Sequence, residues 1–137
     1  MILIACVDDK FGMLFNRRRQ SQDRMLRERV LRLTDGKTLR MNEYSRKQFG
    51  DAEIPQIQVS ETFLQEAGKG DYCFLETLDP APYEKSIEQI VLYKWNRVYP
   101  ADVYFTISLQ EHGWKLTQTT DFAGASHETI TEEVYTK

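Results

Sequence analysis

The sequence predicts an α/β fold in which helices flank a mostly parallel mixed sheet and antiparallel strands end the chain. The chain opens with an uninterrupted apolar run, residues 1–7, which is typical of a strand covered on both faces. Strand and helix patterns then alternate as far as Pro100, and the later segments alternate apolar with polar residues. At 137 residues, 41% apolar and 28% charged, we expect one domain over residues 1–137.

The first half of the chain is predicted to contain one long helix. Ser21 is a hydroxyl residue of the kind that caps helices, and Asp23 lies in the first turn. Leu26, Val30 and Leu33 follow at helical spacing on one face. The other elements predicted here are a loop over residues 8–20, a strand over 38–42 and a short helix over 44–49.

The second half is predicted to contain one more long helix and several strands. Asp79 and Pro80 suit a helix start. An apolar stripe at helical spacing follows, formed by Ile87, Ile90, Val91 and Trp95. The other predicted elements are strands over residues 57–59 and 72–76, a short helix over 61–67, and late strands over 102–107, 114–119 and 127–135.

The net charge of −3 conceals a strong asymmetry along the chain. Residues 1–50 carry a charge of +6 and the remainder carries −9. Two explanations stay open. In the first, the basic and acidic halves neutralise each other across one folded surface or between subunits. In the second, the basic half forms a patch that binds phosphates.

Cysteine usage and the start of the chain indicate a cytoplasmic protein. Cys6 and Cys73 lie inside apolar runs, so we expect reduced, buried thiols. No secretory signal is visible, and the longest apolar run is too short to cross a bilayer, so no membrane partner is expected. His112 and His127 are the only histidines, and neither has a recognisable partner in the sequence.

The order of elements and several residues resemble dihydrofolate reductase over nearly the whole chain. Residues 2–9, followed by Gly12 and Asn16, resemble the first strand and mobile loop of that family. Residues 39–50 resemble its Met-Gly-Arg-x-Thr segment with the following Ile-Gly. The segments that resemble its last strands are 102–107, 113–116 and 133–135. The resemblance implies a shortened dihydrofolate reductase-like fold.

Several departures from the family argue against reductase chemistry. Residues 77–80, Thr-Leu-Asp-Pro, stand where the family has a Gly-Gly pair at the cofactor pyrophosphate. Glu43 replaces the Arg that meets the extra phosphate of NADPH, and residues 17–19, Arg-Arg-Arg, replace a Leu-Pro-Trp. Only residues 50–55 remain where the family holds the adenosine. We therefore expect the fold without NADPH-dependent reduction.

We favour binding of a small molecule, such as a nucleotide or a pterin-like ring, in the remnant cleft. Asp23 matches the substrate-binding acid of the resembled family, although Arg27 stands where that family has a Phe. The candidate binding residues are Arg17, Arg18, Arg19, Asp23, Asn42 and Glu43. A negative charge in the first turn of a helix is also favoured without any ligand.

A second hypothesis is a metal-assisted phosphoester hydrolase of the nuclease type. The crevice of an open α/β sheet lies beyond the carboxyl ends of its parallel strands. Carboxylates that could hold a divalent cation there are Asp8, Asp9, Glu43, Glu76 and Asp79. The catalytic candidates are Asp8, Asp9, Asp23 and Glu76. Strand ends are also polar simply because they meet water, and Asp79 is placed to cap a helix.

A third hypothesis is a module without catalysis. Residues 17–32 contain seven Arg against Asp23 and Glu28, which suits contact with nucleic-acid phosphates. No aromatic residues are interleaved there for base stacking. Self-association into a homo-oligomer, basic half against acidic half, would use the same residues.

Overall fold

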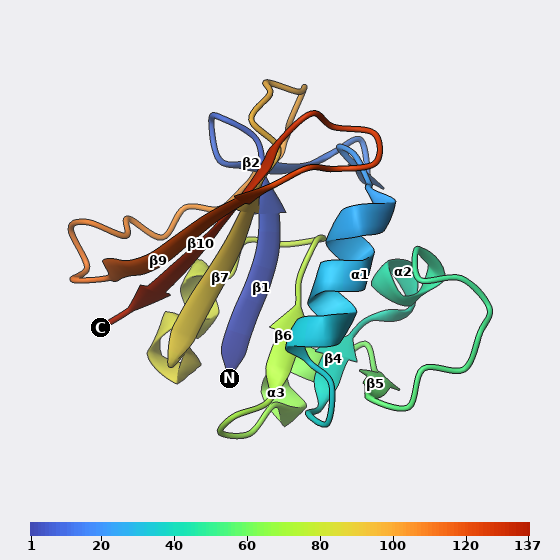
Figure 1. Ribbon diagram of the computed structural model, residues 1–137. Coiled ribbons are helices and arrows are strands. Elements are labelled where there is room, and N and C mark those ends of the chain that lie inside the picture. Colours follow the sequence, from blue (N-terminus) through green and yellow to red (C-terminus); the bar gives the residue numbers. More distant parts are fainter.

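The protein, described over residues 1–137 by a computed structural model, contains a seven-stranded sheet and a three-stranded sheet (Figure 1). The strands are β1 (Ile2–Val7), β2 (Gly12–Phe15), β3 (Arg18–Arg19), β4 (Leu39–Met41), β5 (Ile57–Val59), β6 (Tyr72–Phe74), β7 (Gln89–Lys94), β8 (Val103–Tyr104), β9 (Lys115–Phe122) and β10 (Ile130–Thr136). The helices are α1 (Arg24–Leu33), α2 (Glu43–Lys47), α3 (Phe63–Glu66) and a 3₁₀ helix (Ala81–Ser86). None of them has the length and apolar composition needed to cross a bilayer.

The large sheet has the strand order β5-β4-β6-β1-β7-β10-β9. The first five strands in this order are parallel to one another. β10 pairs antiparallel with β7, and β9 pairs antiparallel with β10. At the centre of the sheet, Ile4 of β1 pairs with Phe74 of β6 and Val91 of β7. The predicted α/β class, with a mostly parallel sheet and antiparallel final strands, is confirmed.

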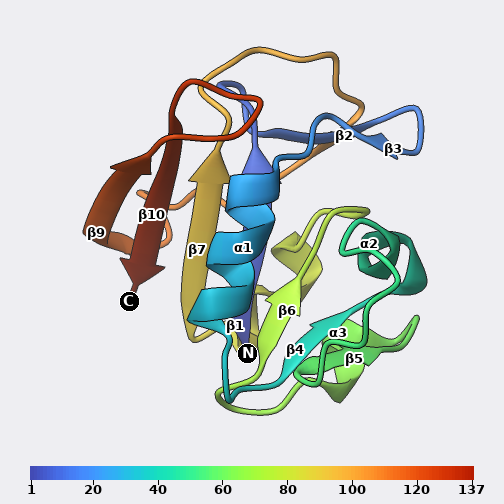
Figure 2. The same cartoon turned by 45° about the vertical axis from the view of Figure 1, so that its right-hand side comes forward.

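The two faces of the large sheet carry separate apolar clusters. Alternate residues of β1 point to opposite faces, so Leu3 belongs to one cluster and Ile4 to the other. Leu26 and Val30 of α1 cover the Ile4 face, and Figure 2 shows α1 lying along β1 and β7. The opposite face is covered by α3 and the segment around the 3₁₀ helix. A strand covered on both faces is apolar throughout, which explains the apolar run at residues 1–7.

The long helix predicted to start at Asp79-Pro80 and run to Trp95 is wrong. Only a 3₁₀ helix forms at Ala81–Ser86, and the chain then enters β7 between β1 and β10. Residues 90–93 are buried on both faces of the sheet, so they form a continuous apolar run. Such a run also places apolar residues at helical spacing, and periodicity alone does not separate the two structures.

The predicted loop over residues 8–20 contains β2 and β3, which form a tight hairpin. Leu14 pairs with Arg19 and Phe15 with Arg18, so Asn16 and Arg17 make a two-residue turn. Both turn residues have positive φ, 51° and 61°, as a type I′ turn requires. The sequence signal was weak because Arg occupies a position where Gly is usual.

The strand predicted over 102–107 is shorter than expected. Only Val103–Tyr104 forms β8, which pairs with β2 in the small sheet rather than with the large one. The backbone N–H groups of Phe105 and Thr106 donate instead to the Phe11 carbonyl and to Asp79. The alternation of apolar and polar residues over 102–107 therefore reflects the burial of Phe105 and Ile107, which are not part of a strand.

The remaining predicted strands are confirmed, and most of them have shifted ends. β5 occupies the predicted residues 57–59, and β9 continues to Phe122. β10 begins at Ile130 instead of residue 127 because His127 is buried away from the sheet ladder, in a cluster with Asp23.

Candidate functional site

Asp8, which directly follows β1, is occupied by hydrogen bonds from its own surroundings. One carboxylate oxygen accepts from the backbone N–H groups of Lys10 and Gly12, both at 2.8 Å. The other accepts from Tyr99 N–H at 3.0 Å and from Gln20 Nε2 at 3.2 Å. Burial alone would raise the pKa of Asp8, but these donors outweigh it and lower that pKa. Asp8 thus organises the loops at this end of the sheet.

Glu76, which follows β6, holds Arg19 in a two-point ion pair. Arg19 Nε lies 3.0 Å from one Glu76 oxygen and Nη2 lies 3.2 Å from the other. The guanidinium also lies over the Tyr44 ring, 4.4 Å from its centroid. The Glu76 side chain is 6% exposed and that of Arg19 is 19% exposed. Arg19 is therefore a structural cation, committed to a carboxylate and an aromatic ring instead of to a ligand phosphate.

The predicted convergence of five strand-end carboxylates does not occur. Asp9 and Glu43 are exposed, and Glu43 begins α2. Asp79 accepts from the backbone N–H groups of Ala81 and Thr106 and from the Thr106 hydroxyl. No group of three or more Asp, Glu, His or Cys side chains is arranged to hold a metal ion. Asp8, Glu76 and Asp79 instead accept hydrogen bonds from donors within the protein.

Asn42 likewise has a local role. Its side-chain oxygen accepts from Ser45 N–H at 3.0 Å and caps α2. Its Nδ2 donates to the Thr77 hydroxyl at 3.1 Å, which ties the end of β4 to the segment after β6.

Asp23 caps α1, in place of the predicted Ser21, and is almost fully buried, with 2% exposure. Its two oxygens accept hydrogen bonds from the backbone N–H groups of Met25, Leu26, Ala125 and Ser126, from the Ser126 hydroxyl and from His127 Nδ1. Burial would raise the pKa of Asp23, yet the donors at 125–127 hold it well below its usual range. Donors within the protein therefore already surround both oxygens of Asp23, the residue that we predicted to bind a substrate.

Only glycine fits at position 124 beside this carboxylate. A Cβ at Gly124 would lie 2.7 Å from the Asp23 oxygen and 2.7 Å from the His127 carbonyl oxygen. The loop before β10 is therefore closely seated on the start of α1.

His127 links Asp23 to two hydroxyl groups. Its Nδ1 lies 3.0 Å from Asp23 Oδ2, and its Nε2 lies 3.0 Å from Ser21 Oγ and 3.1 Å from Tyr99 Oη. The ring stacks on Trp95, with centroids 4.6 Å apart and planes at 25°. Sequence reasoning missed this cluster because 104 residues separate His127 from Asp23, and no local pattern marks the pairing.

A pocket of about 210 Å³ lies beside the β2–β3 hairpin, and we call it the hairpin pocket. Its lining residues are Phe15, Asn16, Arg18, Arg19, Gln20, Tyr99 and Pro100. Arg18 is exposed and its guanidinium makes no hydrogen bond or ion pair within the protein, in contrast to Arg19. Phe15 is 47% exposed. The pocket thus combines one unpaired cation with apolar ring surface.

The Arg-rich segment 17–32 does not form one free basic face. Arg29 makes a two-point ion pair with Glu132 at 2.8 and 3.0 Å, and Arg24 pairs with Glu28. Arg27 donates to Gln22. Together with Arg19, most of these side chains are engaged within the chain. Part of the basic first half is thus neutralised by the acidic second half on the same molecule.

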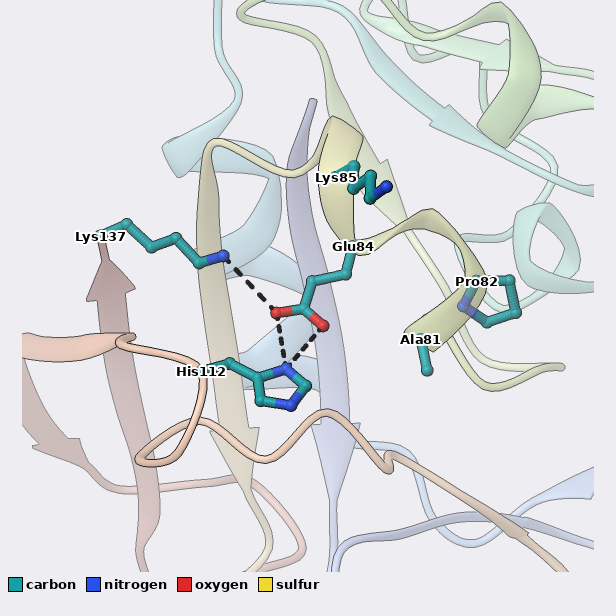
Figure 3. A pocket seen from close by; sticks show the side chains of 6 residues that line it. All are labelled: Ala81, Pro82, Glu84, Lys85, His112 and Lys137. Carbon is teal, nitrogen blue, oxygen red and sulfur yellow. Dashed lines mark hydrogen bonds and ion pairs between the residues drawn. The ribbon is translucent and has the colours of Figure 1, made fainter.

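A second hollow, of about 560 Å³, lies where the C-terminus meets the 3₁₀ helix (Figure 3). His112 Nδ1 lies 2.9 and 3.0 Å from the two Glu84 oxygens, and Lys137 Nζ lies 3.6 Å from one of them. Trp114 Nε1 donates to Glu84 at 3.0 Å, and this bond contributes most to lowering the pKa of Glu84. Lys85 points away from the carboxylate. Glu84 therefore joins three segments of the chain.

The arrangement of strands and helices is that of the dihydrofolate reductase fold, and the predicted resemblance is confirmed at the level of the fold. A solved structure of dihydrofolate reductase from Enterococcus faecalis, complexed with NADP(H) and RAB-propyl, matches with a TM-score of 0.69 and 12% sequence identity. The match covers 98% of this chain and 94% of that chain. No protein-family model and no curated protein sequence matches the chain.

The residues present do not fit the dinucleotide that this fold binds in the reductase structure. The segment after β6 carries the side chains of Glu76 to Asp79 instead of glycine, and the Asp79 carboxylate is bonded to Thr106 there. Glu43 places a further negative charge at the start of α2. Carboxylates repel phosphates, and side chains prevent the close backbone approach that glycines allow.

Proposed function

We propose that this protein binds a small anionic molecule containing a ring, such as a mononucleotide, in the hairpin pocket, without NADPH-dependent reduction. The observation that carries the proposal is the unpaired Arg18 guanidinium beside the rings of Phe15 and Tyr99. An Arg that lacks a carboxylate partner offers two parallel N–H groups to a phosphate. The exposed ring surface suits stacking of a base.

The position of the pocket supports the proposal. Gln20 and Tyr99 line the pocket and also donate hydrogen bonds to Asp8, the residue after β1. The pocket therefore lies by the carboxyl end of a central parallel strand, where open α/β sheets bind ligands. Asp23, Asn42 and Arg19 contribute by shaping the surrounding loops, since their polar groups are already bonded within the protein.

The dimensions of the pocket limit the ligand. About 210 Å³ is below the usual range for drug-sized ligands, so it suits a single ring system, with the charged group reaching Arg18 at the surface. Polymeric nucleic acid is less suited because Arg18 is the one unpaired Arg that lines the pocket. Metal-assisted hydrolysis is less supported, because no three Asp, Glu, His or Cys side chains are grouped to hold a metal ion.

Titration calorimetry with AMP, GMP and inorganic phosphate tests the proposal. We expect a mononucleotide to bind and Arg18→Ala to weaken that binding about 10- to 100-fold, as loss of a charge-assisted phosphate contact does. Arg32→Ala is the matched control, because Arg32 is an exposed, unpaired Arg on α1 outside the pocket, and it should leave affinity unchanged.

Two results would contradict the proposal. One is the absence of any binding or thermal stabilisation by the nucleotides at millimolar concentration. The other is saturable binding of NADPH that Arg18→Ala does not affect, which would place the ligand at the reductase cofactor position.

A further inference from the structure

Ser21, His127 and Asp23 form one hydrogen-bonded line of hydroxyl, imidazole and carboxylate. Ser21 Oγ lies 3.0 Å from His127 Nε2, and His127 Nδ1 lies 3.0 Å from Asp23 Oδ2. We propose that this line is a catalytic triad that cleaves a small ester, with Ser21 as nucleophile, His127 as general base and Asp23 as positioning residue. This activity is separate from ligand binding by Arg18 and does not depend on it.

The surroundings of Asp23 set the tautomer that the reaction needs. Asp23 is held as an anion by backbone N–H groups, so the nitrogen facing it, His127 Nδ1, carries the ring proton. Nε2 then presents a lone pair to Ser21 Oγ. Stacking on Trp95 fixes the plane of the ring, and His127 is only 5% exposed. The base is thus oriented from both sides before any substrate arrives.

The start of α1 favours negative charge next to the nucleophile. The backbone N–H groups of Gln22, Asp23 and Arg24 donate no hydrogen bond within the protein. Asp23 is the N-cap and Arg24 the first residue of a ten-residue helix, whose dipole places partial positive charge at its N-terminus, and Gln22 directly precedes them. An oxyanion formed on the Ser21 adduct would lie close to these donors.

Tyr99 connects the triad to the hairpin pocket. Its hydroxyl lies 3.1 Å from His127 Nε2, and its side chain lines the pocket. Ser21 itself follows the pocket residue Gln20 and is half-buried. The Tyr99 hydroxyl shares the Nε2 lone pair with Ser21 Oγ in the resting protein, so it restrains the nucleophile until a substrate enters.

The reaction balances without a metal or redox partner. Ser21 Oγ attacks the ester carbonyl carbon while its proton passes to His127 Nε2. The carbon–oxygen bond to the alcohol then breaks, and that alcohol leaves with the proton from Nε2. Water attacks the acyl-serine, gives its proton to Nε2, and the acid departs as Ser21 Oγ recovers the proton.

An active-site probe tests the proposal on the whole protein. We expect an alkyl fluorophosphonate to modify one site, assigned by peptide mass spectrometry to Ser21. Ser21→Ala should abolish this modification, and His127→Gln should slow it at least about 100-fold, the usual contribution of a general base. Tyr99→Phe should accelerate it, because the competing hydroxyl is removed. Ser86→Ala, on the distant 3₁₀ helix, serves as the control and should leave the rate unchanged.

Circular dichroism checks that each variant is folded, so a loss of labelling can be assigned to the altered side chain. Modification of the wild-type protein at Ser126 or elsewhere, no modification at all, or a rate unchanged in Ser21→Ala would overturn the proposal. The role of Asp23 has its own measurement, since imidazole ¹⁵N shifts of His127 should report the Nδ1–H tautomer in the wild type and its loss in Asp23→Asn. An unchanged tautomer would refute that role. Loss of nucleotide binding alone would leave these results intact.

Discussion

Replacing Asp23 by Asn should destabilise the protein strongly, although the two side chains have the same shape. The carboxylate accepts six hydrogen bonds at the junction of α1 with the loop before β10. An amide keeps one acceptor oxygen and turns the other position into a donor. Whichever way it is oriented, N–H groups of either the helix start or the loop then face an NH₂ group.

The expected loss in the free energy of unfolding at pH 7 is about 3 to 4 kcal/mol. Hydrogen bonds to a charged acceptor contribute about 1.5 to 3 kcal/mol each, and several bonds fail together while the loop relaxes partly. Loss of a helix cap alone costs about 1 kcal/mol. Domains of this size have about 5 to 15 kcal/mol in total, so the variant should remain folded and measurable.

The difference in the free energy of unfolding between the wild type and Asp23→Asn should also become smaller at low pH. The pKa of Asp23 is lowered in the folded state, so the unfolded chain takes up the proton first as the pH falls below about 4. The wild type then loses stability that Asp23→Asn never had. Between pH 6 and pH 3 the gap between the two proteins should narrow by about 1 kcal/mol.

Urea denaturation followed by tryptophan fluorescence at pH 6 and pH 3 measures both effects. Asp35→Asn is the control, because Asp35 is exposed and its side chain makes no hydrogen bond, so its effect should stay within about 0.5 kcal/mol. A deficit below 1 kcal/mol for Asp23→Asn, or a gap that is equal at both pH values, would refute the assigned role of this carboxylate.

Two further predictions concern the hairpin and the thiols. Arg17→Gly should raise the free energy of unfolding by about 0.5 to 1 kcal/mol in urea titrations, because φ is +61° at this turn position; a lowered midpoint would contradict it. Burial raises the pKa of the Cys73 thiol to about 12 and raises that of Cys6 as well, so neither should react with a disulfide reagent at pH 8 until the protein unfolds. Rapid reaction of the native protein would show that these strands open.

The central strand and the first helix could be predicted because local patterns report burial. β1 must be apolar on both faces, and α1 must present Leu26 and Val30 to the sheet. Local pattern led to a wrong prediction for β7, because its fully buried residues 90–93 also fit the spacing of a helix. Position in the sheet, between β1 and β10, decided the conformation there.

The positions of the candidate site residues along the strands could be predicted from the sequence, but their contacts could not. The sequence indicated polar residues at the carboxyl edge of the sheet, and Asp8, Glu76 and the Arg17–Arg19 run do lie on the segments that follow β1 and β6 or adjoin them. Their partners were not predictable. Arg19 meets Glu76 across 57 residues, so one expected phosphate ligand became a structural ion pair while its neighbour Arg18 stayed unpaired.

By itself, the sequence determined the α/β class, the buried central strand, the amphipathic α1 and the carboxylates at 43 and 76–79 that do not suit a dinucleotide. These follow from side-chain periodicity and charge, which act over a few residues. The tertiary structure alone decided that Asp23 faces His127, and His127 faces Ser21, over separations of 104 and 106 residues. Such contacts depend on strand order and on how the loop before β10 seats against the start of α1, which no local pattern encodes.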